Sequence, residues 1–216
     1  MKNIVIFDMD GTILNSLGDL TAALNYVLAL HGYPARSEQQ ACDALGKGVA
    51  YFLKHNIPEP VDDKTLEQYV KEFKEYYPAN MYNTTAPYGG ILNLLATLKA
   101  RGCKLGVISN KFDAAVKGLC DKYFNGIFDA AVGETAGVKR KPAPDSVFKV
   151  LEQLGADKKQ AVYVGDSEVD YQTAVNAGLP CISVTWGFRN KEYLKAIGAN
   201  NFADTPRQVA DMVELL

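Results

Sequence analysis

Short, uniformly apolar runs recur along this chain, and they constrain its fold more than any other feature. They cover residues 4–7, 105–108, 130–132, 161–164 and 181–184. Uniform apolarity over a few residues is typical of strands that are buried on both faces of a parallel sheet. Helical periodicity fills three of the intervals between them, at 89–101, 146–154 and 167–177. This alternation predicts an α/β protein with a Rossmann-like, doubly wound parallel sheet.

One long segment interrupts the alternation. Between about residues 17 and 84 the sequence has helical stretches and no convincing strand. Ser37 and Gln40 have the spacing of a capping box for one helix, and an aromatic stripe from Leu66 to Tyr76 marks another. The turn-rich run at 82–90 then leads the chain back. We therefore predict a core domain of residues 1–15 and 85–216, with an all-helical domain of residues 16–84 inserted into it.

Composition and charge exclude several classes of protein. The 216 residues include 23 Lys and Arg against 25 Asp and Glu, a net charge of −2, whereas a general nucleic-acid binder carries a basic excess. No apolar run approaches the roughly 18 residues of a membrane span. Acidic residues follow the first short apolar run directly, unlike a signal peptide. We expect a cytoplasmic monomer or homodimer that binds neither nucleic acid nor membrane.

The four cysteines are far apart in the sequence and form no C-x-x-C pair. A disulfide framework or a structural zinc site needs closer or paired spacing. We expect four reduced thiols, as is usual in the cytosol.

Polar residues follow the apolar runs where ligands bind in open α/β sheets, at the carboxyl ends of the strands. These residues are Asp8, Asp10, Ser109, Asn110, Lys111, Lys141, Asp166 and Asp170. Carboxylates gathered in one crevice repel one another unless a hard cation bridges them. Mg²⁺ prefers oxygen ligands and is commonly held by one or two carboxylates together with substrate phosphate.

Asp8 and Asp10 are two residues apart, so in an extended chain both side chains point the same way. Such a pair divides the chemistry, because one carboxylate serves as nucleophile while the other donates and accepts protons. The alternative is that both merely cap the next helix. Asp166 and Asp170 are four apart, and both face a metal if Ser167 opens a helix. Alternatively, the helix dipole alone favours an acid in that first turn.

The other two candidates are weaker on their own. Ser109 and Asn110 supply a hydroxyl and amide donors, but this dipeptide is also common in turns and at helix starts. Lys141 lies in a K-P-A-P run whose prolines stiffen the backbone, so its charge is placed to stabilise phosphate in a transition state. Lys139 and Arg140 are adjacent, and charge alone does not choose among the three.

The motifs DMDGT at 8–12, ISN ending at Asn110, KPAP from Lys141 and GDSEVD at 165–170 resemble the four ordered motifs of the haloacid dehalogenase-like (HAD) hydrolase superfamily. The inserted helical domain resembles its type-1 cap. Within the superfamily, SNK at 109–111 and TWGFR at 185–189 are similar to phosphoglycolate phosphatase-like members. True dehalogenases of the superfamily lack the second acidic residue of the first motif, so Asp10 disfavours carbon–halogen cleavage.

The resemblance implies a role for each matching residue. Asp8 attacks phosphorus to form an aspartyl-phosphate, and Asp10 protonates the leaving alcohol and later activates water. Mg²⁺ is held by the Asp8 carboxylate, the Asp10 backbone carbonyl and Asp166, with support from Asp170. The phosphoryl oxygens are held by Ser109, the Asn110 backbone and Lys141.

The cap is expected to close over the site and set specificity. Lys47 stands between two glycines in the inserted domain and is a candidate contact for the organic end of the substrate, or else a solvated loop lysine. Lys111 and Arg189 are further specificity candidates in the core domain.

The function predicted is a Mg²⁺-dependent phosphatase that acts on a small phosphorylated metabolite, with 2-phosphoglycolate as the leading substrate. A β-phosphoglucomutase-like phosphotransferase, a pyrophosphatase and a promiscuous sugar phosphatase share the same motifs and remain open. A non-catalytic module that binds phosphorylated ligands is disfavoured, because both Asp8 and Asp10 are present.

Overall fold

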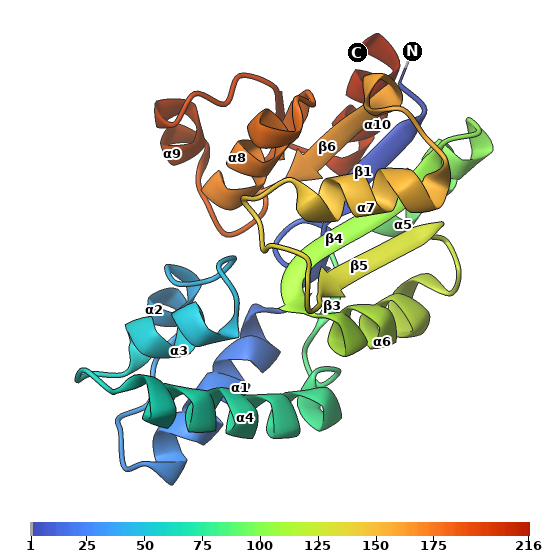
Figure 1. Ribbon diagram of the computed structural model, residues 1–216. Coiled ribbons are helices and arrows are strands. Elements are labelled where there is room, and N and C mark those ends of the chain that lie inside the picture. Colours follow the sequence, from blue (N-terminus) through green and yellow to red (C-terminus); the bar gives the residue numbers. More distant parts are fainter. Residues whose placement is uncertain (1) are drawn as a thin grey trace. The chain divides into compact units, whose positions relative to one another are not determined.

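The five apolar runs form strands of one sheet, as predicted, in the computed structural model, which describes residues 2–216. The sheet has the order β5-β4-β1-β6-β7-β8, and each neighbouring pair is parallel. Its strands are β1 (Ile4–Asp8), β4 (Lys104–Phe112), β5 (Ala130–Glu134), β6 (Ala161–Gly165), β7 (Cys181–Val184) and β8 (Phe202–Ala203). The chain adds β4 and β5 on one side of β1 and then β6, β7 and β8 on the other, which confirms the doubly wound topology. Figure 1 shows β5, β4, β1 and β6 of this order.

Strand β1 is the centre of the sheet and is buried along its whole length. Asp8 pairs in register with Ile108 of β4, and Phe7 pairs with Val164 of β6. The carboxyl ends of β1, β4 and β6 therefore meet at one edge of the sheet. Strand β4 is longer than predicted, so Ser109, Asn110 and Lys111 belong to its last residues and not to a following turn.

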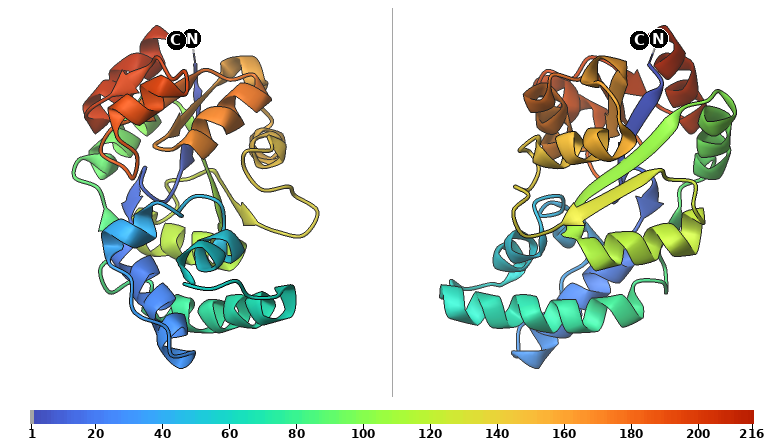
Figure 2. Two further views of the ribbon diagram at one scale, coloured as in Figure 1. Left: turned by 90° about the vertical axis from the view of Figure 1, so that its left-hand side faces the viewer. Right: turned by 45° about the vertical axis from the view of Figure 1, so that its right-hand side comes forward.

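Helices cover both faces of this sheet (Figures 1 and 2). They are α5 (Ile91–Ala100), α6 (Asp113–Phe124), α7 (Asp145–Leu154), α8 (Glu168–Ala177), α9 (Lys191–Ala196) and α10 (Pro206–Leu215), with a short 3₁₀ helix η1 (Lys158–Gln160) before β6. The predicted helices at 89–101, 146–154 and 167–177 correspond to α5, α7 and α8.

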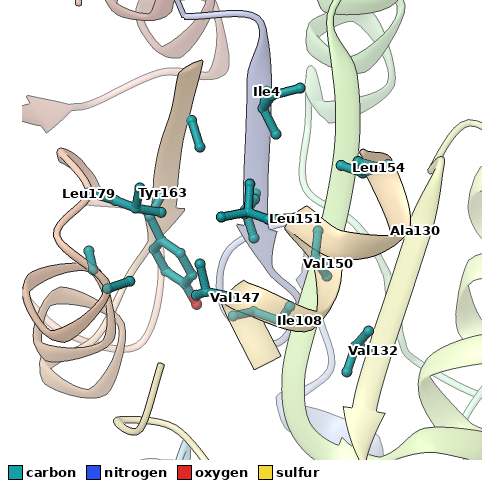
Figure 3. Packing of buried hydrophobic residues seen from close by; sticks show 14 of the residues in the cluster. Ile4, Ile108, Ala130, Val132, Val147, Val150, Leu151, Leu154, Tyr163 and Leu179 are labelled. Atoms are coloured by element: carbon teal, nitrogen blue, oxygen red, sulfur yellow. The ribbon is translucent and has the colours of Figure 1, made fainter. Parts of the chain in front are cut away.

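Alternate residues of β1 face opposite sides of the sheet, as the two-residue period of a strand requires. Ile4 and Ile6 join a cluster with the inner faces of α7 and α8 (Figure 3). Phe7 faces the other way and meets Phe128 edge-on at 6.3 Å, and Phe128 packs against Phe124 of α6. Each fully buried side chain of this size contributes about 1.5–3 kcal/mol relative to exposure, which explains the apolar runs.

The chain divides into two compact units, one of residues 1–14 and 87–216 and the other of residues 15–86. The second unit contains the helices α1 (Leu17–Leu30), α2 (Glu38–Cys42), α3 (Val49–Asn56) and α4 (Asp63–Asn80). The short strands β2 (Leu14–Asn15) and β3 (Ala86–Pro87) pair as a separate two-stranded sheet. The assignment of the second unit as a cap remains a prediction.

The helices of the second unit pack partly through the aromatic stripe expected from the sequence: α4 buries Tyr69 and Phe73 of that stripe, together with Tyr77 in place of Tyr76. Phe73 and Tyr77 of α4 stack with ring centroids 5.5 Å apart, and Phe52 of α3 meets Phe73 edge-on. Ser37 and Gln40 form the predicted capping box at the start of α2. Buried aromatic rings therefore form the interior of this unit.

None of the helices within residues 2–216 is sufficiently long and apolar to span a bilayer. The four cysteines are buried as thiols.

Candidate active site

The turn after β1 is built so that the chain leaves the sheet beside its acidic edge. The carbonyl of Met9 accepts the backbone N–H groups of Thr12, Ile13 and Leu14 at 3.3, 3.0 and 3.0 Å. Gly11 has φ of +87°, and a Cβ there would collide with the carboxylate of Asp166. Glycine is therefore required both for the backbone conformation and for the approach of Asp166.

Lys141 forms ion pairs with Asp8, the predicted nucleophile, and with Asp170 of the GDSEVD motif. Its ammonium lies 2.7 Å from Oδ1 of Asp8 and 2.7 Å from Oδ1 of Asp170, and all three side chains are buried. The backbone of Lys141 is held in turn by Asn110, whose side chain accepts from the Lys141 N–H at 2.8 Å and donates to its carbonyl at 2.9 Å. The two prolines that follow limit the backbone further, so the ammonium is fixed at the sheet edge.

Asp170 lies in the first turn of α8, as predicted, and accepts several hydrogen bonds. Ser167 caps this helix, and its backbone N–H donates to Oδ2 of Asp170 at 3.1 Å. The hydroxyl of Tyr163 donates to Oδ1 at 2.9 Å. A Cβ at Gly165 would collide with Asp170, so the glycine at the end of β6 makes room for this carboxylate. Burial, together with the Asp170 charge, raises the pKa of Tyr163 well above its usual value, which keeps the phenol protonated.

Asp166 is fully buried at the carboxyl end of β6. It accepts a hydrogen bond from the Thr12 hydroxyl at 2.8 Å and another from the backbone N–H of Phe188 at 2.7 Å. A Cβ at Gly187 would collide with its side chain. Burial, followed by the charge of Asp170, raises the pKa of Asp166 to about 7. A nearby cation would therefore stabilise the ionised form of Asp166, which burial and Asp170 disfavour.

Asp10 has different neighbours from Asp8. The hydroxyl of Ser109 donates to Oδ2 of Asp10 at 3.3 Å, and the ammonium of Lys111 lies 3.3 Å from its Oδ1. The backbone N–H of Lys111 donates to the same hydroxyl at 3.1 Å. The end of β4 thus surrounds Asp10 with donors, and Lys111 is itself buried.

The electrostatic balance of the site is negative. Asp8, Asp10, Asp166 and Asp170 face two ammonium groups, those of Lys111 and Lys141. Burial and the neighbouring Asp170 hold the pKa of Asp8 well above its usual range, although Lys141 opposes the shift. Burial lowers the pKa of Lys141, but the Asp170 and Asp8 carboxylates outweigh it, so that pKa lies above its usual value. When all four carboxylates are ionised, the cluster has two negative charges in excess.

The donor set fits a hard divalent cation. Asp8, Asp166 and Asp170 each offer a carboxylate oxygen, and these oxygens lie within 4.8 Å of one another. All three residues are buried, and they supply oxygen alone, which Mg²⁺ prefers over nitrogen or sulfur. A divalent ion also matches the excess charge of the cluster.

The structure brings most of the predicted site residues together. Their contacts at the sheet edge form two groups. One joins Asp10, Ser109 and Lys111. The other joins Asp8, Asn110, Lys141 and Asp170, and a carboxylate oxygen of Asp166 lies within 4.8 Å of those of Asp8 and Asp170. Arg189 pairs with Glu168 of α8 at 2.9 Å. Lys47 lies in the second unit, with its ammonium 5.0 Å from the ring centre of Tyr51.

Two side chains of the site were not predicted from the sequence. Thr12 was noted only as the end of the first motif, yet its hydroxyl binds Asp166 and its carbonyl accepts from the Trp186 ring N–H at 3.0 Å. Tyr163 looked like one more member of an apolar strand. The signal that could have found it is a phenol in an otherwise aliphatic run, two residues before a glycine.

Fold and site together define an α/β protein with a buried acidic centre suited to a divalent cation. The model of the haloacid dehalogenase-like hydrolase family matches residues 5–184. The chain therefore belongs to the haloacid dehalogenase-like hydrolases, as its four motifs indicated.

Comparison with individual proteins shows which members of this family the chain resembles. A phosphoglycolate phosphatase of Aquifex aeolicus is 33% identical over 186 residues, which covers 86% of this chain and 85% of the relative. A phosphoglycolate phosphatase of Rhodospirillum rubrum is 32% identical over 92% of this chain and 86% of its own length. The crystal structure of a protein from Lactobacillus delbrueckii subsp. bulgaricus, assigned by inference as a phosphoglycolate phosphatase, has a TM-score of 0.92 and 36% identity over 99% of both chains. The predicted resemblance to phosphoglycolate phosphatase-like members is thus confirmed.

Proposed function

We propose that this chain is a Mg²⁺-dependent phosphatase that hydrolyses a small phosphate monoester, with 2-phosphoglycolate as the leading substrate. The observation that carries the proposal is the contact of the Asp8 carboxylate with the Lys141 ammonium at 2.7 Å, beside a second acid two residues later. The names of the curated relatives support the choice of substrate.

In the first half-reaction, a carboxylate oxygen of Asp8 attacks phosphorus and the bond from phosphorus to the ester oxygen breaks. Asp10 donates a proton to the departing alkoxide, so that the alcohol leaves neutral. The product on the protein is an acyl phosphate on Asp8. The donors around Asp10 keep its side chain directed at the sheet edge, where that proton is needed.

In the second half-reaction, Asp10 takes a proton from water, and the water oxygen attacks phosphorus. The bond between phosphorus and the Asp8 oxygen breaks, which returns both carboxylates to their starting states and releases phosphate. One acid thus serves in turn as proton donor and proton acceptor. This division explains why two carboxylates stand at the end of one strand.

Ser109, the Asn110 backbone and Lys141 are assigned as the groups that bind the phosphoryl oxygens of the substrate. Of these groups, Lys141 already contacts the nucleophile and Ser109 contacts the proton donor, so both lie beside the reacting atoms. The residues that would hold Mg²⁺ are Asp8, the Asp10 carbonyl and Asp166, with Asp170 in support. When bound, the ion supplies positive charge that stabilises the phosphoryl oxygens.

Specificity is assigned to the inserted domain of residues 16–84 acting as a cap, and to three basic residues. Lys47 is the candidate in that domain, and Lys111 and Arg189 are the candidates in the core. A carboxylate-bearing substrate such as phosphoglycolate needs a second cation besides those that bind its phosphate. Lys47→Ala should therefore lower kcat/KM for phosphoglycolate more than for a neutral alkyl phosphate. An equal loss for both substrates, or an unchanged kcat/KM for both, would contradict the assignment.

The test is turnover of purified protein with Mg²⁺ on a panel of phosphoglycolate, hexose phosphates, nucleotides and pyrophosphate. We expect phosphate release from phosphoglycolate with the highest kcat/KM. Asp8→Asn should reduce kcat by about 10³-fold or more, because the nucleophile is lost. Asp121→Asn, which changes an exposed carboxylate of α6, is the matched control and should behave as wild type.

Two results would contradict the proposal. Full turnover by Asp8→Asn would remove the proposed nucleophile. Transfer of the phosphoryl group to a sugar, with release of phosphate requiring a bisphosphate primer, would favour the phosphotransferase alternative instead.

A further inference from the structure

The hydroxyl of Tyr163 is a buried polar group of the site to which the proposed mechanism gives no task. The residue is fully buried in β6, and its ring lies in the aliphatic cluster under α7 and α8 (Figure 3). Its hydroxyl nevertheless contacts two charged groups, since it donates to Oδ1 of Asp170 at 2.9 Å and accepts from Lys141 at 3.3 Å. A phenylalanine would fill the same volume, so packing alone does not explain the oxygen.

The strand register explains how the hydroxyl reaches the charged edge. Tyr163 pairs with Ile6 of β1, two residues before Asp8, so its side chain and that of Asp8 share one face of the sheet. Gly165 comes two residues after Tyr163 on the same face and leaves its place to Asp170. The Tyr163 ring therefore packs beside Ile6, and its hydroxyl reaches the Asp170 carboxylate, which lies in the space beside Gly165.

The ammonium of Lys141 has its three donors matched by three acceptors. It lies 2.7 Å from Asp8, 2.7 Å from Asp170 and 3.3 Å from the Tyr163 hydroxyl, and a lysine has three N–H donors. The contact to Tyr163 is the longest of the three. Oδ1 of Asp170 accepts from both the lysine and the phenol. The two donors therefore share one carboxylate oxygen, and a change in one contact alters the other.

We propose that Tyr163 is a positioning residue of the phosphoryl-transfer reaction, whose hydroxyl sets how the Lys141 ammonium is divided between Asp170 and the Asp8 nucleophile. The inference rests on the proposed function. The phenol donates a hydrogen bond to Asp170 and accepts one from Lys141. Both contacts weaken the electrostatic attraction between the Asp170 carboxylate and the Lys141 ammonium. Without the hydroxyl, Asp170 retains the lysine more strongly, and less positive charge is available to the phosphoryl group on Asp8.

The first test is the Tyr163→Phe variant, which removes the hydroxyl alone. We expect kcat to fall about 10-fold, the effect of one lost positioning hydrogen bond, while KM changes by less than about twofold. Tyr171→Phe is the matched control, because its hydroxyl donates to the Gly198 carbonyl at 2.9 Å in the same unit but outside the site. An unchanged kcat in Tyr163→Phe, or an equal loss in Tyr171→Phe, would overturn the inference.

The second test asks whether Tyr163 acts through Lys141. Orthovanadate, which imitates the five-coordinate phosphorus, is titrated in the presence of Mg²⁺ by calorimetry, so that no turnover is needed. Tyr163→Phe should weaken its binding about 10-fold in the wild-type background and have no further effect in Lys141→Met. Equal weakening in both backgrounds would overturn the inference.

Different results would contradict the proposed function and the role of Tyr163. Absence of turnover by the wild-type protein on the whole panel would contradict the proposed function. Normal turnover by wild type, together with an unaltered Tyr163→Phe enzyme, would contradict only the role of Tyr163. Urea unfolding of each variant checks that its stability is close to that of wild type.

Discussion

Asp8 and Asp10 differ only in their surroundings, and at the residue scale this difference suggests how they divide the reaction. Asp8 is buried against Lys141, whereas Asp10 lies between a hydroxyl and a second lysine. Neighbouring carboxylates in unlike environments commonly take the two roles of nucleophile and proton carrier. Substitutions of Asp10 and Gly11 test that division and the turn that makes it possible.

Asp10→Asn should separate the two half-reactions. With a nitrophenyl phosphate the leaving group needs little protonation, so the first step should still proceed. The second step should slow by about 10²–10⁴-fold, because no base activates the water. Rapid mixing should then show a burst of nitrophenol close to one equivalent per protein, followed by very slow turnover. A steady rate equal to that of wild type, without a burst, would contradict the role of Asp10.

Gly11→Ala should disturb the site through sterics alone. The residue has φ of +87°, and its Cβ would collide with Asp166, so the methyl group forces a shift of the turn or of the carboxylate. We expect a loss of about 1–3 kcal/mol in the free energy of unfolding, together with weaker Mg²⁺ binding. Gly102→Ala is an informative control, because φ there is +77° but no atom lies within 4 Å of the added Cβ. Equal effects on Mg²⁺ affinity would show that the collision is unimportant.

At the scale of elements, Asp19 of α1 binds the segment at the C-terminal end of the second unit. The carboxylate is buried and accepts hydrogen bonds from the backbone N–H and hydroxyl groups of both Thr84 and Thr85, at 2.7–3.1 Å. The two segments are about 65 residues apart in sequence. One carboxylate therefore joins the beginning and the end of a helical unit.

Asp19→Asn should destabilise this unit by about 1.5–3 kcal/mol at pH 7, since the amide offers one acceptor oxygen where the carboxylate offers two. Burial opposes ionisation, but the hydrogen bonds from Thr84 and Thr85 outweigh it and hold the pKa of Asp19 below its usual value. The unfolded chain thus takes up a proton at higher pH than the folded one. The contribution is present above about pH 4 and is lost as the pH falls through the lower folded pKa.

Urea unfolding between pH 7 and pH 3 measures this contribution. The difference in free energy of unfolding between wild type and Asp19→Asn should shrink as the pH falls. Asp121→Asn controls for the loss of a carboxylate in general. A difference that stays constant down to pH 3 would contradict the account.

At the scale of the whole molecule, folding gathers charged and polar side chains that lie far apart in the sequence. Asp8 and Lys141 are 133 positions apart, and Thr12 and Asp166 are 154 apart. Bringing the carboxylates of Asp8, Asp166 and Asp170 within 4.8 Å of one another costs electrostatic energy, which a bound divalent cation would offset. The stability of the protein should therefore depend on Mg²⁺ and on pH together.

Without Mg²⁺, wild-type stability should fall as the pH rises from about 4 to about 7. The pKa of Asp166 is raised by burial and by Asp170 to about 7, so over this range the folded protein binds a proton that the unfolded chain has released. Asp166→Asn should show a weaker fall. Saturating Mg²⁺ at about 100 times its Kd should stabilise wild type by about 2.7 kcal/mol and the variant much less. Thermal unfolding with Mg²⁺ and with a chelator measures both effects, and an equal response of the two proteins would exclude Asp166 as a ligand.

Local patterns in the sequence determined most of the architecture. The apolar runs predicted five strands of the sheet, and the helical stretch after the first motif predicted the helices of the inserted segment. These features were readable because burial on both faces of a strand, or on one face of a helix, imposes a short-range period. The four motifs likewise identified the family, since each is a contiguous stretch of sequence. Three of them lie at the carboxyl end of a strand, and KPAP lies in the loop between β5 and α7.

Tertiary structure alone decided which side chains meet. Three basic residues stand in a row at 139–141, and the fold buries Lys141 against Asp8 while Arg140 pairs with Glu134. Likewise, the sequence pattern indicated only that Tyr163 is a packed strand residue. The strand register brings its hydroxyl into hydrogen-bond contact with Asp170. Such partners lie on different strands and helices, so no period along the chain reports them. The packing of the sheet sets their distances, and through those distances the charge that each group experiences.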